Sequence, residues 1–196
     1  DKVKAEQFVL PIGKKKTHVI GINPSQITTE DLAVSLQPAA NYVPTDGYSK
    51  VAAVERHHNT GKIGVAVAKG YGIRNGASSV SHDSHNIIVI GDNDRDMALA
   101  VDEIIRTQGG YTVVENGEVF ETLPLPIMGL MSDAGFESVN ETLGRMIKKA
   151  HEMGVPADIE PFITLSFLAL PVIPTLRITP RGLCLLTAKG PEILQE

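Results

Sequence analysis

The densest group of side chains able to do chemistry is Ser81-His82-Asp83-Ser84-His85-Asn86, a polar segment between two apolar runs. A carboxylate beside an imidazole fixes the ring tautomer and raises its basicity, so His82, Asp83 and His85 are candidate catalytic residues for proton transfer. In an extended segment Asp83 and His85 share one face, whereas in a turn His82 and His85 converge. The alternative is a purely structural role for this segment, because polar side chains often form hydrogen bonds with backbone groups where a strand ends.

A second polar group, Glu55-Arg56-His57-His58, ends another β-rich run. Alternation along an extended chain places Glu55 beside His57 and turns Arg56 to the opposite face, so half of the group faces solvent. We take Glu55 and His57, together with Asn86, as candidate substrate-binding residues.

Patterns for several other chemistries are missing from the sequence. A metal centre at residues 82–86 would need further ligands from elsewhere, such as His57 or His58, and there is no His-x-His motif. On these residues alone such a site stays open but incomplete, and we name no residue of this chain as a metal ligand. The glycines of residues 70–76 precede another β-rich run, whereas a phosphate-binding loop requires a helix there. The lone Cys184 has no neighbouring base to activate it as a nucleophile.

Composition excludes further classes of function. The formal net charge of −5 leaves no basic surplus for phosphate groups, so we expect no nucleic-acid partner. The longest apolar stretch, residues 165–173, is far short of the ~20 residues that span a bilayer, so we expect no membrane insertion. A single cysteine fits a reducing compartment and predicts a cytoplasmic protein. With 42% hydrophobic residues the chain can bury a core.

The elements that must position these side chains are mostly strands. Short β-rich runs come in pairs separated by turn residues, and the Asn116-Gly117 dipeptide predicts a type I′ hairpin. Helical spacing of apolar residues predicts two main helices, at about 94–108 and 137–153, while the apolar tail at 162–170 is typical of a central strand. We therefore predict an α+β fold, a two-layer sandwich with a mixed or antiparallel sheet built from hairpins and both helices on one side. Residues 1–16 are expected to be a lead-in segment, and residues 17–196 a single domain.

The run from Leu123 to Met131 is unusually apolar for a loop, and its two prolines forbid a helix. Such a segment must be covered, either by the core of this domain or by another domain or subunit.

Several long stretches together resemble one known family, the C-terminal region of bacterial-type adenine deaminases. The most recognisable are Ser81-His-Asp-Ser-His-Asn-Ile-Ile-Val89 and Leu123-Pro-Leu-Pro-Ile-Met-Gly-Leu-Met-Ser-Asp133. The others are residues 18–22, 27–30, 54–57, 93–100 and 161–174. The resemblance spans nearly the whole chain, and its colinear motifs are far more specific than any short pattern above.

The resemblance implies an enzyme of the amidohydrolase superfamily that converts adenine and water into hypoxanthine and ammonia. Its metal, manganese or iron, would be bound by an N-terminal (β/α)8 barrel, which 196 residues are too few to contain. Because the chain also opens at Asp1, we expect an excised C-terminal domain that is inactive alone. Its expected partners are adenine, the barrel of the same polypeptide and further copies in a homo-oligomer. His82, Asp83 and His85 would face the barrel.

A second hypothesis belongs to a different class of function. The chain would then be a free-standing small-molecule-binding or regulatory module that uses the same fold without catalysis.

Overall fold

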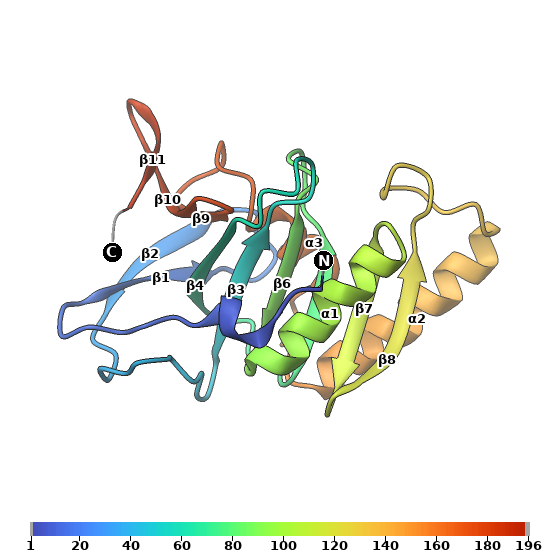
Figure 1. Cartoon of the computed structure of the whole chain (residues 1–196), viewed down its shortest axis with the longest axis horizontal. Coiled ribbons are helices and arrows are strands. Elements are labelled where there is room, and N and C mark those ends of the chain that lie inside the picture. The colour runs from blue at the N-terminus through green and yellow to red at the C-terminus, as the bar shows by residue number, and fades with distance from the viewer. Residues whose placement is uncertain (1, 195–196) are drawn as a thin grey trace.

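The computed structural model describes residues 2–194 and is built around one long, twisted sheet (Figure 1). Eight strands form this sheet in the order β2-β1-β4-β3-β6-β5-β7-β8, and β9, β10 and β11 form a smaller sheet. Neighbouring strands of the large sheet pair antiparallel except β1 and β4, which run parallel. The strands are β1 (Thr17–Ile22), β2 (Thr29–Val34), β3 (Tyr48–Val54), β4 (Ile63–Lys69), β5 (Gly76–Val80), β6 (Ile87–Gly91), β7 (Gly110–Glu115), β8 (Glu118–Pro124), β9 (Leu176–Thr179), β10 (Gly182–Thr187) and β11 (Gly190–Ile193).

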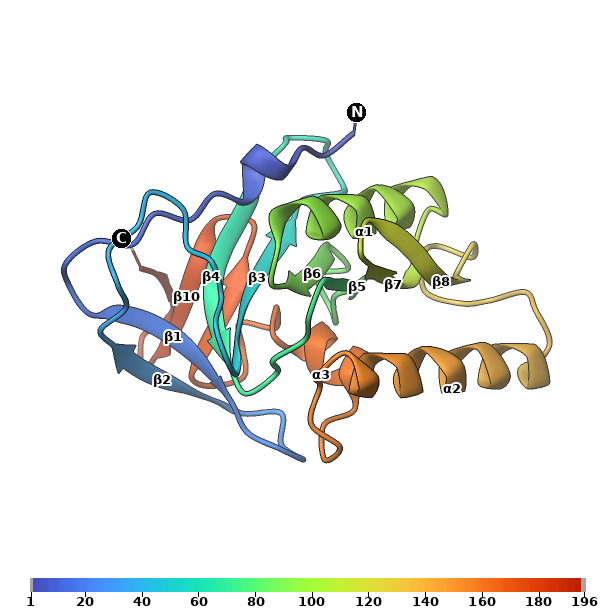
Figure 2. The same cartoon turned by 90° about the horizontal axis from the view of Figure 1, so that it is seen from below.

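Both faces of the large sheet are covered, as the view from below shows (Figure 2). The helices are η1 (Ala5–Phe8), α1 (Asp94–Arg106), α2 (Phe136–Glu152) and α3 (Pro161–Phe167). One core cluster joins Ala52 and Val89 of the sheet to Phe8 of η1 and to α1. Another, on the opposite face of the sheet, joins Val51 and Ile88 to α2, α3 and β9. Successive residues of a strand point to opposite faces, which explains why β6 and the second half of β3, residues 51–54, are apolar on both faces.

The α+β class, the mixed sheet and both main helices are confirmed. One detail of the predicted sandwich is wrong: the helices do not share one side, so the fold has three layers instead of two. The apolar residues of the central strands supply two buried faces, and each face needs its own cover. The sequence pattern of continuous apolar strands already contained this signal.

The segment predicted as a central strand at 162–170 is a short helix, α3. Pro161 stands at the start of the helix, where its missing N–H group costs nothing, and the Glu160 side chain accepts a hydrogen bond from the backbone of Ile163. α1 begins in a similar way, because the side chain of Asn93 accepts from Asp96 N at 2.9 Å. α2 starts after Gly135, a residue that offers no side chain to cap the helix.

Candidate functional site

Four connecting segments meet at one end of the large sheet, which we call the loop end (Figure 1). They are residues 55–62 between β3 and β4, residues 81–86 between β5 and β6, residues 107–109 after α1, and residues 125–131 after β8. The antiparallel pairing of β3, β4, β5 and β6 brings the first two loops to the same edge. All six predicted site residues lie in these two loops.

The 81–86 loop is a tight turn held by its own backbone. Ser81 N donates to Asn86 O at 2.8 Å and His85 N donates to Ser81 O at 3.1 Å. Asp83 and His85 adopt left-handed backbone conformations, with φ of 60° and 52°. Residues other than glycine seldom adopt this conformation, although Asp and His do so more often than most. Such outliers concentrate at functional sites, because the surrounding structure must enforce them.

His82 contacts α3 through both its backbone and its ring. Its backbone N–H donates to Ser166 O at 3.0 Å, and its ring stacks on Phe167 with centroids 4.6 Å apart. Its Nδ1 atom lies 3.3 Å from Asp83 Oδ1, and both side chains are exposed by about half or more. The structure therefore pairs His82 with Asp83, a combination that neither the extended nor the turn interpretation favoured.

His57 joins the two loops. Its Nε2 atom lies 2.7 Å from Ser84 O. A carbonyl oxygen can only accept, so Nε2 carries the proton and Nδ1 of the neutral ring is left as an acceptor. Asn86 makes a second link, in which its Oδ1 atom accepts from Arg56 N at 3.3 Å. The ring of His85 is half-buried and has no hydrogen-bond partner within residues 2–194.

Glu55 turns back onto its own loop instead of facing a ligand. Oε1 accepts from the backbone of His57 at 2.6 Å and of His58 at 2.8 Å, and Oε2 accepts from the N–H and the hydroxyl of Thr60, both at 3.0 Å. Hydrogen bonding to the charged form, from the Thr60 N–H first, lowers the pKa of Glu55 to about 2. The carboxylate thus fixes the loop that carries His57.

Arg56 is the residue of this site that sequence reasoning missed. Alternation assigned it to the other face, and there it crosses to the 125–131 loop, where Nη2 donates to Met128 O at 3.1 Å. Partial burial lowers the pKa of its guanidinium. Together with His57, Ile87 and the end of α1, Arg56 lines a hollow of about 430 Å³.

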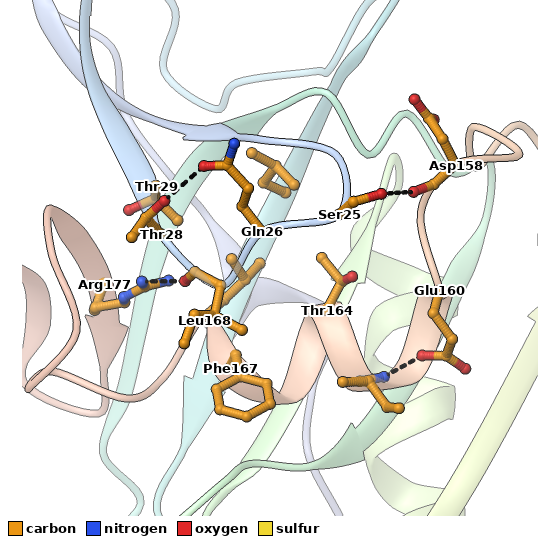
Figure 3. A pocket seen from close by; sticks show the side chains of 13 residues that line it. Ser25, Gln26, Thr28, Thr29, Asp158, Glu160, Thr164, Phe167, Leu168 and Arg177 are labelled. Carbon is orange, nitrogen blue, oxygen red and sulfur yellow. Dashed lines mark hydrogen bonds between the residues drawn. The ribbon is translucent and has the colours of Figure 1, made fainter.

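A smaller hollow of about 260 Å³ lies between the β1–β2 loop and α3 (Figure 3). Its walls include Ser25, Gln26, Glu160, Phe167 and Arg177. Burial raises the pKa of Glu160 and lowers that of Arg177 to about 10. The guanidinium of Arg177 donates to backbone carbonyls, among them Ile173 O at 2.8 Å. Since the lining residues come from distant segments, no sequence pattern marked this hollow.

The described residues do not fit a complete metal centre. Within residues 2–194 there is no group of three or more His, Cys, Asp or Glu side chains arranged to hold a metal ion. The same range contains no helix of the length and apolarity that crossing a bilayer demands. The two loops carry imidazole, carboxylate and amide side chains, which can transfer protons and form hydrogen bonds.

Comparison with known proteins links these loops to a family. The sequence profile described as "Adenine deaminase C-terminal domain" matches residues 26–189. A protein named "Adenine deaminase" from Desulfitobacterium hafniense (strain Y51) is 50% identical over 185 residues, which are 92% of this chain and 32% of that protein. A protein of the same name from Nitratidesulfovibrio vulgaris (strain DP4) is 49% identical over 181 residues, 90% of this chain and 32% of that protein. The chain spans about a third of the length of these curated relatives.

Proposed function

Because the chain belongs to the adenine deaminase C-terminal domain family, we propose that it is the C-terminal third of an adenine deaminase and that its 81–86 loop contributes to the active site. The complete enzyme would convert adenine and water into hypoxanthine and ammonia. The observation that carries this proposal is the way the loop is held. Asp83 and His85 are kept in left-handed conformations by a turn that His57 braces on one side and α3 on the other.

Each residue of the loop end has a distinct part in this proposal. Replacing the amino group of adenine by oxygen requires a proton to reach the departing nitrogen, and the His82–Asp83 pair and His85 are placed to transfer protons. Asn86 and His57 contact the base through their amide and imidazole groups. Glu55 acts through His57 as a positioning residue, because both of its oxygens are occupied by donors of its own loop.

A manganese or iron ion would activate the attacking water in the complete enzyme. We assign this ion to the part of the polypeptide outside this chain, since the described residues 2–194 offer no cluster that fits it. No step proposed for this chain runs through the metal.

Two further expectations accompany the proposal. A cytoplasmic location agrees with the single, buried Cys184. Assembly into a homo-oligomer remains a prediction. The alternative of a free-standing binding module is not favoured, because the curated relatives extend well beyond the region that this chain matches.

The test is ammonia release from adenine, with manganese added, by this chain and by the complete polypeptide that contains it. We expect activity only in the complete polypeptide, and we expect His82→Ala, Asp83→Asn and His85→Ala each to reduce kcat by about a hundredfold or more. Activity of the isolated chain would contradict the proposal that this chain needs the rest of the polypeptide for catalysis. Unchanged kcat in all three variants would overturn the role of the loop.

The chain supplies a matched control for these variants. His18 and Asp31 form another exposed His–Asp pair, with Nδ1 2.9 Å from Oδ1, on the strands β1 and β2 far from the loop end. His18→Ala and Asp31→Asn should leave kcat unchanged, which separates an effect of the site from a general effect of removing a His–Asp pair.

A further inference from the structure

The 125–131 loop, named here the Met128 loop, presents an apolar surface to solvent. Met128 is 77% exposed, Met131 54%, Ile127 43% and Leu130 37%, whereas Leu125 is buried. Large apolar side chains gathered on one exposed loop typically mark an interaction site.

The exposure of these side chains is built into the loop. Ile127 and Met131 exchange two backbone hydrogen bonds, at 3.1 and 3.2 Å, and Leu125 N donates to Gly109 O at 3.1 Å. Arg56 holds Met128 O from the neighbouring loop. The backbone is thus tied down at both ends and in the middle, so the apolar side chains cannot fold back into the core of this domain.

The place where the polypeptide enters this domain points to what covers the loop. Val3 N donates to Asp102 Oδ1 on α1 at 2.8 Å. One helical turn further on, the exposed side chain of Ile105 lines the same hollow as Arg56, and the backbone of Gln108 lies against Gly129 of the Met128 loop. A continuous strip therefore leads from Val3 along α1 to Met128, and Figure 2 shows the segment that leads into η1 above α1.

We propose that Ile105 and the Met128 loop form the docking surface for the part of the polypeptide that precedes Val3 in the complete protein. This inference rests on the proposed function, because it requires that a further part of the polypeptide precedes Val3. The matched relatives are about three times as long as this chain, and the matching family is a C-terminal domain. An apolar partner face is required, because no charged side chain belongs to the loop. Docking there would also close the edge beside His57 and the 81–86 loop to water.

The five methionines allow a direct test by hydrogen peroxide, which oxidises an exposed thioether to the sulfoxide while it is reduced to water. Met128 and Met131 are exposed, and Met97, Met146 and Met153 are buried and serve as internal controls. In the isolated chain we expect Met128 and Met131 to oxidise first. In the complete polypeptide we expect the oxidation rate of both methionines to fall by about tenfold or more, as measured by mass spectrometry of their peptides.

Charge substitutions give an independent readout. Met128→Glu and Met131→Glu should leave the melting temperature of the isolated chain unchanged, but in the complete polypeptide they should expose a protease-sensitive junction. Val43→Glu is the matched control, because Val43 is also a well-exposed apolar loop residue but precedes β3 at the other end of that strand. It should alter neither protein.

The outcomes separate this proposal from the proposed function. Equal oxidation rates in the isolated chain and the complete polypeptide would overturn the docking surface, even if the polypeptide deaminates adenine. Protection of both methionines without deamination would support the surface and overturn the function. Protection that appears in the isolated chain only as it self-associates would assign the surface to a second copy and overturn the proposed occupant.

Discussion

The imidazole of His82 lies nearly parallel to the phenyl ring of Phe167, with 4.6 Å between the ring centroids and 16° between the ring planes. Phe167 is the last residue of α3, and it also lines the 260 Å³ hollow. The position of the proposed proton-transfer residue is therefore set by a helix that lies about eighty residues further along the chain.

Phe167→Ala tests this relationship. Loss of the ring frees His82 to leave its position near Asp83, and small displacements of catalytic groups are costly, so we expect kcat/KM of the complete enzyme to fall by about ten- to a hundredfold. Because Phe167 is only half-buried, the free energy of unfolding should fall by about 1–3 kcal/mol, less than for a fully buried Phe. Steady-state kinetics and urea unfolding measure the two effects.

Two controls accompany Phe167→Ala. Phe167→Tyr keeps the stacking ring and should retain activity, and Ile163→Ala removes an exposed side chain of the same helix without touching His82. If Phe167→Ala keeps full kcat/KM in a folded protein, the stacking contact does not position His82.

Glu55→Gln tests the carboxylate that shapes the His57 loop. The pKa of Glu55 is lowered from 4.5 to about 2 in the folded state, so the group stabilises the fold fully above its unfolded pKa. This contribution disappears as the pH falls from about 4.5 towards 2. The variant should therefore be less stable than the parent at pH 6, and the difference should shrink at pH 3. Urea unfolding at both pH values measures it.

Glu118→Gln provides the comparison for Glu55→Gln. Glu118 is an exposed residue of the β7–β8 hairpin without a side-chain hydrogen bond inside residues 2–194, so its substitution should have the same small effect at both pH values. A stability difference for Glu55→Gln that does not change with pH would contradict the assigned role of the charge.

Local features of the fold were predictable because they depend on neighbouring residues. The helical spacing of Met97, Val101 and Ile104 after Asn93 predicted α1, and Asn116 and Gly117 have the two positive φ angles, 54° and 81°, that the hairpin prediction required. In contrast, a seven-residue apolar segment fits a strand and a buried helix equally well, so α3 was missed.

The site was predictable only in its residue types. The polar segment at 81–86 was located, but its contacts come from Ser166 and Phe167 of α3 and from His57, which are distant in sequence. The link from Arg56 to Met128 joins residues 72 positions apart. Contacts of this kind follow from strand order, and a single sequence does not specify strand order.

Lys50→Met tests a buried charge outside the site. Lys50 is 1% exposed, and its Nζ atom donates to Asp94 Oδ1 and Asn41 Oδ1, both at 2.6 Å, and to Phe8 O at 3.0 Å. Removing the ammonium leaves a partly buried carboxylate without its partner, so we expect a loss of about 3–5 kcal/mol in the free energy of unfolding. Chemical denaturation of the isolated chain measures it.

A second substitution shows whether the unpaired carboxylate of Asp94 causes the loss of stability in Lys50→Met. Asp94→Asn in the Lys50→Met background removes the unpaired carboxylate and should recover part of the loss. Lys14→Met, at an exposed lysine, should change stability by no more than about 0.5 kcal/mol. A loss for Lys50→Met as small as that of Lys14→Met would contradict a stabilising role for the network.

Two glycine substitutions of opposite sign test the Met128 loop against an ordinary helix position. Gly129 has φ of +78°, and a Cβ atom there would lie 2.5 Å from Arg56 Nη1, so Gly129→Ala should destabilise the chain and detach the loop from Arg56. Gly144 is an exposed residue inside α2 with open space where an alanine methyl group would lie, so Gly144→Ala should stabilise the chain by about 0.5–1 kcal/mol. Thermal unfolding of both variants gives the signs, and a stabilising Gly129→Ala would show that Arg56 and the backbone angle do not hold the loop.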